Sequence, residues 1–184
     1  MDVSTHGAGT GVVIGVELQD EGLREVGGDA TFSISSAKPG NGVEQLRDNN
    51  LETFWQSDGQ APHMINIHFP RKTAVSLLCF YVDYSVDESY TPKKVSVRAG
   101  HTQHDLIDMT ASIDLHEASG WVQIAIEDST NPGKPLRTHL LQLKLIGMQQ
   151  NGRDAHVRGI KVFGPRLNKD PYCTVEMQQF GSIR

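Results

Sequence analysis

Hydrophobic and polar side chains alternate in several short stretches of the chain, and Gly, Pro, Asn and Asp separate these stretches. In residues 64–69, Ile65, Ile67 and Phe69 occupy every second position. Successive side chains of a strand point to opposite faces of its sheet, so this period of two predicts a half-buried strand. Similar alternation, or a short apolar run, predicts about seven strands in all, in residues 31–35, 64–69, 75–82, 94–98, 120–126, 139–146 and 158–164.

Helical periodicity is limited to two short segments. Residues 18–26 match a short N-terminal helix that Gly22 weakens. Residues 42–48 match one helical turn, because Val43 and Leu46 lie three positions apart. The remaining connections are too short for repeated βαβ crossovers. The elements therefore predict an all-β fold, an antiparallel sandwich or barrel.

The two ends of the chain lack this periodicity. Residues 1–15 are rich in Gly, Thr and Val, and we expect a flexible N-terminal extension there. The glycines of "GAGTGVVIG" would suit a phosphate-binding loop, but the strand before it and the helix after it are missing. Residues 167–184 show no clean pattern and are expected to form a C-terminal tail. The β-sandwich domain is therefore expected over residues 16–166.

Composition narrows the classes of protein further. A net charge of -5 argues against a surface built around a nucleic-acid backbone. Two cysteines, Cys79 in an apolar run and Cys173 in a polar one, are typical of a reducing compartment, although a disulfide between them is an alternative. The N-terminus has no basic n-region, and no apolar run reaches membrane-spanning length. We expect a soluble intracellular protein with two free thiols.

Catalytic and metal-binding patterns are weak. A glycosidase needs two facing carboxylates, one with a raised pKa. The sequence offers several acids but does not show any two of them face to face; they are Asp48, Glu52, Asp58, Asp87, Glu88 and Asp154. No Ser-His-Asp or Cys-His signature is present. His101 and His104 would share a helix face, but they follow a strand and a glycine, so we expect a surface loop and no metal. No cofactor is expected.

Three polar loops have a composition typical of recognition surfaces. Loop 1 is residues 48–59, "DNNLETFWQSDG"; loop 2 is residues 87–92, "DESYTP"; loop 3 is residues 150–158, "QNGRDAHVR". Each joins predicted elements, where side chains are free to bind a ligand, and Trp55 and Tyr90 could serve as anchors. Ordinary turns and core packing explain each loop equally well when it is taken singly. We call the three loops together the rim.

Several blocks of the sequence resemble a known family. They are "SSAKPGNGVEQLRDNNLETFWQSDGQAPHMINIHF", "DESYTPKKVSVRAG", "SGW", "QNGRDAHVRGIKVFGP" and the terminal "IR". Together they are similar to the DOC-domain subunits of the anaphase-promoting complex, often called subunit 10. The resemblance covers about residues 24–166 and the last three residues.

This resemblance implies a jelly-roll β-sandwich related to galactose-binding and discoidin-type domains. It implies a non-enzymatic subunit of a multi-subunit ubiquitin ligase, present in the nucleus and the cytoplasm. Together with a WD40 coactivator, such a subunit binds the destruction box of cyclin- and securin-like substrates and raises processivity. A carbohydrate-binding module that uses the same end of the sandwich is the alternative, and a glycosidase is a distant third.

The resemblance also places the degron-binding residues on the rim, at the substrate-facing end of the sandwich. Ser89 and Asn151 are expected to hydrogen-bond an extended peptide, and the acids to attract its basic residue. The full set is Asp48, Asn49, Asn50, Trp55, Glu88, Ser89, Tyr90, Asn151, Arg153, Asp154 and His156.

The resemblance further implies that the final Ile183 and Arg184 dock into the groove of a tetratricopeptide-repeat (TPR) scaffold subunit. Ile can fill an apolar pocket, and a guanidinium can pair with a carboxylate through two hydrogen bonds. The chain departs from many relatives at two positions. Ala37 and Phe54 stand where Cys and Tyr are common, so a thiol and a hydroxyl are lost, and neither belongs to the expected binding groups.

Overall fold

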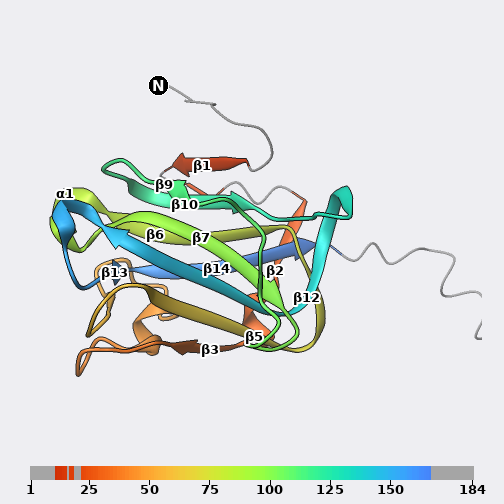
Figure 1. Cartoon of the computed structure of the whole chain (residues 1–184), viewed down its shortest axis with the longest axis horizontal. Coiled ribbons are helices and arrows are strands. Elements are labelled where there is room, and N and C mark those ends of the chain that lie inside the picture. Colours follow the sequence, from red (N-terminus) through yellow and green to blue (C-terminus); the bar gives the residue numbers. More distant parts are fainter. Residues whose placement is uncertain (1–10, 16, 19–21, 167–184) are drawn as a thin grey trace, which may run out of the picture.

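The computed structural model describes residues 11–15, 17–18 and 22–166, which form two antiparallel sheets packed face to face (Figure 1). One sheet has five strands in the order β1-β10-β6-β14-β2. The other has seven strands along the path β3-β5-β12-β7-β8, with β11 beside β12 and β9 beside β7. A separate two-stranded ribbon pairs β4 with β13.

The strands are β1 (Val12–Gly15), β2 (Leu23–Glu25), β3 (Thr31–Ile34), β4 (Trp55–Gln56), β5 (His63–Val75), β6 (Leu77–Asp83), β7 (Pro92–Gly100), β8 (Ile107–Asp108), β9 (Ile113–Asp114), β10 (Ser119–Ala125), β11 (Glu127–Asp128), β12 (Asn131–Met148), β13 (His156–Val157) and β14 (Gly159–Pro165). The helical segments are short: the helix α1 (Tyr84–Asp87) and the 3-10 turns η1 (Gly27–Asp29), η2 (Val43–Leu46), η3 (Glu88–Tyr90) and η4 (Gln149–Asn151). None of the described helices is long and apolar enough to cross a membrane.

The core lies between the two sheets and is built from every second residue of their strands. Phe80 of β6 and Val122 of β10 face Ile65 of β5 and Leu143 of β12, and all four side chains are fully buried. These are the positions that the alternating pattern predicts, so the all-β sandwich prediction is confirmed.

The outer face of the five-stranded sheet carries a second, smaller apolar cluster. Cys79, Trp121 and Phe163 form it, with Leu18 and Tyr81 packed against them. The Cys79 thiol is buried there. The nearly continuous apolar run of residues 75–82 is therefore covered on both faces, as the sequence predicts.

Two segments differ from the predicted elements. Residues 23–25 of the predicted N-terminal helix form strand β2, so the helix is wrong there; the backbone turns at Gly22, where φ is +75°, and β14 offers a free edge. Residues 12–15 fall in the expected flexible extension, but they pair with β10 as strand β1. The turn predicted in residues 42–48 is confirmed as η2. Residues 1–10 of the extension and the whole C-terminal tail lie outside the described residues.

Candidate functional site

The register of the strands brings loops 2 and 3 to one end of the sandwich. Strand β12 ends where β7 begins, since Met148 pairs with Pro92. Strand β6 ends where β14 begins, since Gly159 pairs with Tyr81. The β6–β7 connection, which is α1 and η3, therefore lies beside the β12–β14 connection, which contains η4 and β13 (Figure 1).

Gly152 fixes how closely loops 2 and 3 approach each other. A Cβ atom at this position would overlap the carbonyl oxygen of Ser89, so only glycine fits without displacing the backbone. Next to it, the amide of Gln149 donates to the carbonyl of Thr91 at 2.9 Å. The backbones that carry Ser89 and Asn151 are therefore in direct contact.

Loop 1 joins the same end through β4 and through Arg158. Trp55 of β4 pairs with Val157 of β13. The Arg158 guanidinium donates to the carbonyl oxygens of Leu51 and Glu52, at 3.0 and 3.2 Å. Loop 1 is thus attached to the last two residues of loop 3, Val157 and Arg158, and the whole rim lies on one end of the molecule.

The carboxylate of Asp87 binds the side chains that connect the three loops. Its carboxylate accepts two hydrogen bonds from Arg158, at 2.7 and 2.8 Å, and one from Nδ1 of His156 at 2.9 Å. All three residues are at most 8% exposed. Charge-assisted bidentate pairs of this kind are strong and geometrically specific. A buried carboxylate of loop 2 therefore positions two side chains that hold loops 1 and 3.

The pKa of Asp87 agrees with this role. Burial by itself would raise its pKa, but the hydrogen bonds from His156 and Arg158 outweigh burial, so the pKa lies below the usual range. The hydrogen bond to Asp87 in turn raises the pKa of Arg158. Asp87 is ionised at neutral pH, which is the opposite of what a glycosidase needs in its general acid.

Two aromatic rings stack against the imidazole of His156. The His156 imidazole lies between Phe54 of loop 1 and Tyr90 of loop 2, with ring centroids 4.1 and 4.3 Å apart and interplanar angles of 23° and 10°. Its Nε2 atom is buried and has no hydrogen-bond partner within the described part of the chain. His156 therefore links one side chain from each of the other two loops.

Loop 1 is shaped by its own side chains. The Asp48 carboxylate accepts from the Asn50 amide at 2.8 Å and from the Thr53 hydroxyl at 2.6 Å, and the Asn50 side chain accepts from the Glu52 amide at 3.0 Å. Asn49 between them has a φ of +59°, in the left-handed region. These Asx-type turns hold the loop in one shape before any ligand arrives.

Several residues of the rim have a left-handed backbone conformation. Among the described residues, five other than glycine have a positive φ, and four of them belong to the rim, namely Asn49, Glu88, Gln150 and Asn151. Such conformations are uncommon for residues with a side chain, and they concentrate at functional sites when the surrounding structure imposes them. The strain marks the rim as the candidate site.

Comparison with known proteins decides the family. The chain matches the family model of "Anaphase-promoting complex, subunit 10 (APC10)" over residues 7–184. It is 48% identical over 167 residues to anaphase-promoting complex subunit 10 of Homo sapiens, covering 88% of this chain and 89% of that protein. It is 49% identical over 166 residues to the Dictyostelium discoideum protein of that name, covering 87% and 86%. The chain belongs to the anaphase-promoting complex subunit 10 family. The resemblance inferred from the sequence is confirmed.

Solved structures show which fold the subunit 10 family shares with other proteins. The family 32 CBM of C. perfringens NanJ in complex with galactose has a TM-score of 0.62 and 12% identity, and covers 77% of this chain and 98% of that one. The CBM32-1 and CBM32-2 domains of ZmpB in complex with GalNAc have a TM-score of 0.69 and 14% identity, covering 89% and 41%. At such identities the likeness shows the fold alone, and it supports the predicted galactose-binding-like jelly roll.

Most residues that the family resemblance points to are accessible. The exposed ones are Asp48, Asn49, Asn50, Glu88, Tyr90, Asn151 and Arg153, and Ser89 is partly exposed. Asp154 is partly buried and pairs with Lys38 at 3.1 Å. Burial would raise the pKa of Asp154, but the hydrogen bond and charge of Lys38, together with hydrogen bonds from Gln56 and Gly59, outweigh burial and lower the pKa.

Trp55 and His156 are placed differently from the rest of that set. Trp55 is fully buried, packs in the main core and donates from Nε1 to the carbonyl of Ser36 at 2.9 Å. His156 is 7% exposed, behind Tyr90 and Phe54. Both residues support the rim from within, and neither presents a free polar atom at its surface.

Sequence reasoning missed the residues that hold the rim together. Arg158 counted as part of a polar loop and Asp87 as a turn acid, whereas Phe54 was noted only for the hydroxyl that it lacks. Its ring face, and not a hydroxyl, makes the contact with His156. One signal was available: Arg158 lies between Val157 and the predicted strand residue Ile160, and a charge at the start of a buried strand needs a buried partner.

Metal binding has no support in the described part of the chain. Those residues contain no group of three or more His, Cys, Asp or Glu side chains arranged to hold a metal ion. The rings of His101 and His139 lie 5.6 Å apart, next to the Gly100–Leu140 pair at the end of β7 away from the rim, but the described residues supply no third ligand.

Proposed function

We propose that the chain is a non-catalytic substrate-recognition and processivity subunit of the anaphase-promoting complex, a ubiquitin ligase, and that its rim binds destruction-box degrons jointly with a WD40 coactivator. Substrates of this kind are cyclins and securin. Ubiquitin transfer takes place on other subunits, and the protein works in the nucleus and the cytoplasm. Membership of the subunit 10 family supports the assignment to the complex.

The observation that carries the degron-binding proposal is the convergence of the three loops. Ser89 and Asn151 lie on backbones in contact through Gly152, and Arg158 attaches loop 1 to the same cluster. Their exposed side chains and amides form one surface of hydrogen-bonding groups on a rigid support. An extended peptide, with its own row of unpaired N–H and C=O groups, is a ligand with matching chemistry.

The weak affinity expected between the rim and a degron peptide explains why a second receptor is needed. A hydrogen bond contributes about 1 kcal/mol net, and somewhat more when one partner is charged. A few such bonds give weak binding. A peptide held at its other end by a coactivator would meet the rim at a high effective concentration, so the joint complex lasts longer than either contact alone. Longer residence allows more ubiquitin transfers per encounter.

A second part of the proposal concerns attachment to the complex. We propose that Ile183 and Arg184 dock into a TPR scaffold subunit. Both lie outside the described residues, and the support is that the match to the subunit 10 family model extends to residue 184.

The degron-binding proposal is tested by the substitutions Asn49→Ala, Asn50→Ala and Ser89→Ala in one chain. Incorporated into the complex, this rim variant should shorten the ubiquitin products formed in a single encounter with a destruction-box substrate, while the amount of assembled complex stays the same. The matched control carries Gln103→Ala, Ser129→Ala and Lys134→Ala, three exposed positions. Gln103 follows the last residue of β7, and Ser129 and Lys134 belong to the β11–β12 hairpin; because β7 begins and β12 ends at the rim, all three lie at the opposite end of the sandwich. Equal product lengths for the rim variant and the control would contradict the proposal.

A further inference from the structure

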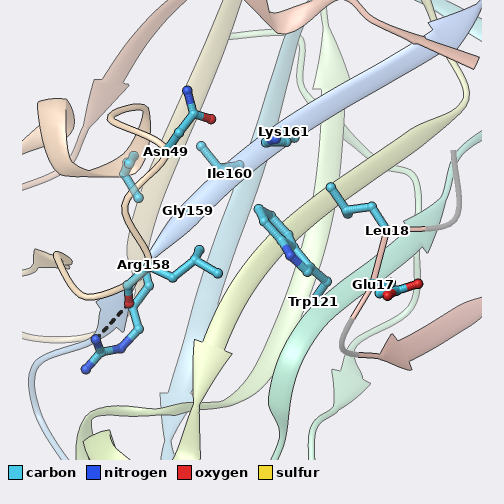
Figure 2. Close-up of a pocket in the computed structure, with 10 residues that line it drawn as sticks. Glu17, Leu18, Asn49, Trp121, Arg158, Gly159, Ile160 and Lys161 are labelled. Atoms are coloured by element: carbon cyan, nitrogen blue, oxygen red, sulfur yellow. Dashed lines mark hydrogen bonds between the residues drawn. The ribbon is translucent and has the colours of Figure 1, made fainter.

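A pocket of about 300 Å³ opens between loop 1 and the outer face of the five-stranded sheet (Figure 2). We call it the outer pocket. Apolar groups make up most of its wall, with Asn49, Lys161 and Arg158 at its polar side. Its lining residues are Glu17, Leu18, Leu46, Asn49, Leu51, Trp121, Arg158, Gly159, Ile160 and Lys161. Empty cavities of about 150 Å³ hold a benzene molecule, so this one has room for an aliphatic side chain.

Gly159 creates this space. A Cβ atom there would lie 3.3 Å from the Trp121 ring and 3.6 Å from the Leu51 side chain, so any larger residue would fill the pocket between them. Leu51 is 37% exposed although it is aliphatic and lines a concave surface. Burying a side chain of this size under a ligand is favourable, because it removes further apolar area from water.

Lys161 supplies a positive charge without a fixed partner. Its ammonium lies 5.7 Å from the centre of the Trp121 ring, and no described carboxylate pairs with it. The other cation of the wall, Arg158, is neutralised by Asp87. The carboxylate of Glu17 lies beyond Trp121, on the side away from Asn49 (Figure 2). A carboxylate that enters from the Asn49 side would therefore meet Lys161 before Glu17.

The outer pocket is continuous with the rim. Asn49 belongs to loop 1 and also lines the pocket, and the Arg158 guanidinium holds the backbone of Leu51. A peptide that leaves the rim over loop 1 enters the pocket directly. Because Asn49 itself lines the pocket, a peptide bound at Asn49 already lies at the wall of the pocket.

We propose that the outer pocket is a subsite for the flank of the degron peptide, where it takes an aliphatic side chain with an acidic residue next to it. The proposal rests on the function proposed above, since the rim must first hold the peptide. It adds a preference that the polar rim cannot provide: the aliphatic side chain packs between Leu51 and Trp121, and the neighbouring carboxylate pairs with Lys161. Substrates with and without such a flank are then processed to different extents.

The test measures peptide binding to the assembled complex with its coactivator. Destruction-box peptides carry a Leu-Asp pair, a Leu-Lys pair or a Gly-Ser pair in the flank, placed at each end of the degron in turn. At one end, the Leu-Asp peptide should bind about tenfold more tightly than the Gly-Ser peptide. The variant Lys161→Glu should lower the affinity for the Leu-Asp peptide about threefold or more, leave the Gly-Ser peptide unchanged, and bind the Leu-Lys peptide better than the wild type does.

Lys134→Glu is the matched control, because Lys134 is exposed and lies near the start of β12, whose other end, at Met148, borders the rim. If Leu-Asp and Gly-Ser flanks bind equally at both ends while the rim variant still weakens binding, the subsite is overturned and the function of the rim stands. If the rim variant also has no effect, the proposed function itself fails. If Lys161→Glu reduces incorporation into the complex without changing peptide selectivity, the pocket contacts another subunit, and the subsite is again overturned.

Discussion

Asp87 determines the shape of the rim although it presents no atom at the rim's surface. Its replacement by Asn leaves the guanidinium of Arg158 buried without a counter-charge. Removing one partner of a buried ion pair costs about 3 kcal/mol or more of the free energy of unfolding. We therefore expect Asp87→Asn to lower that free energy by about 3 kcal/mol, measured by urea unfolding at pH 7.

The pH dependence of the same variant checks the cause. The folded-state pKa of Asp87 lies below its ordinary value, so its contribution to stability is complete above the unfolded pKa, near 4, and is lost as pH falls through the folded value. The difference between the wild type and Asp87→Asn should shrink below about pH 4. Asp114→Asn is the control, because Asp114 is exposed and 3.9 Å from Lys94, and it should change stability by less than about 0.5 kcal/mol. A difference that stays constant down to pH 2.5 would exclude the ion pair as its source.

At the scale of the structural elements, the close contact between η3 and η4 depends on the absence of a side chain at Gly152. Gly152→Ala would place a Cβ against the Ser89 carbonyl, and rigid backbone on both sides leaves little room to adjust. We expect a loss of at least about 2 kcal/mol in unfolding free energy and shorter ubiquitin products, because the two loops separate. Gly28→Ala serves as the control, since a Cβ there meets no atom within 4 Å and should change neither quantity. Wild-type stability in Gly152→Ala would show that the loops tolerate separation.

The strands of the core could be predicted from the sequence, and the elements at their edges could not. Alternation locates Ile65, Val122 and Leu143 in the core, because the pattern of burial in a sandwich is local and periodic. Residues 23–25 were assigned to a helix because a weak helical period matched, while the free edge of β14 that pairs with them is a tertiary feature. Strand β12 is longer than its apolar run, since its first residues, from Asn131, are polar and exposed.

For the molecule as a whole, the rim residues could be named from the sequence, but their convergence depends on sheet register. The pairing of Met148 with Pro92 and of Gly159 with Tyr81 brings together loops that are about 60 residues apart in the chain. No local pattern encodes those pairings. The same limit applies to the outer pocket, whose walls come from loop 1, β10 and β14. Composition showed loops of recognition type, and only the fold shows that they form one surface.

If the rim binds the substrate, as proposed, the protein needs a separate attachment to its complex, and the proposed role of the C-terminal residues gives the final prediction. Deleting Ile183 and Arg184 removes an aliphatic side chain and a guanidinium, the two groups expected to dock into a TPR groove. The deletion should reduce co-purification with the complex severalfold and leave the stability of the isolated domain unchanged, because the last strand of the sandwich, β14, ends at Pro165. The rim variant should give the opposite result, with normal co-purification and shorter ubiquitin products. A deletion variant that co-purifies fully but forms short products would mean that the two sites are coupled, and that the tail does not serve attachment alone.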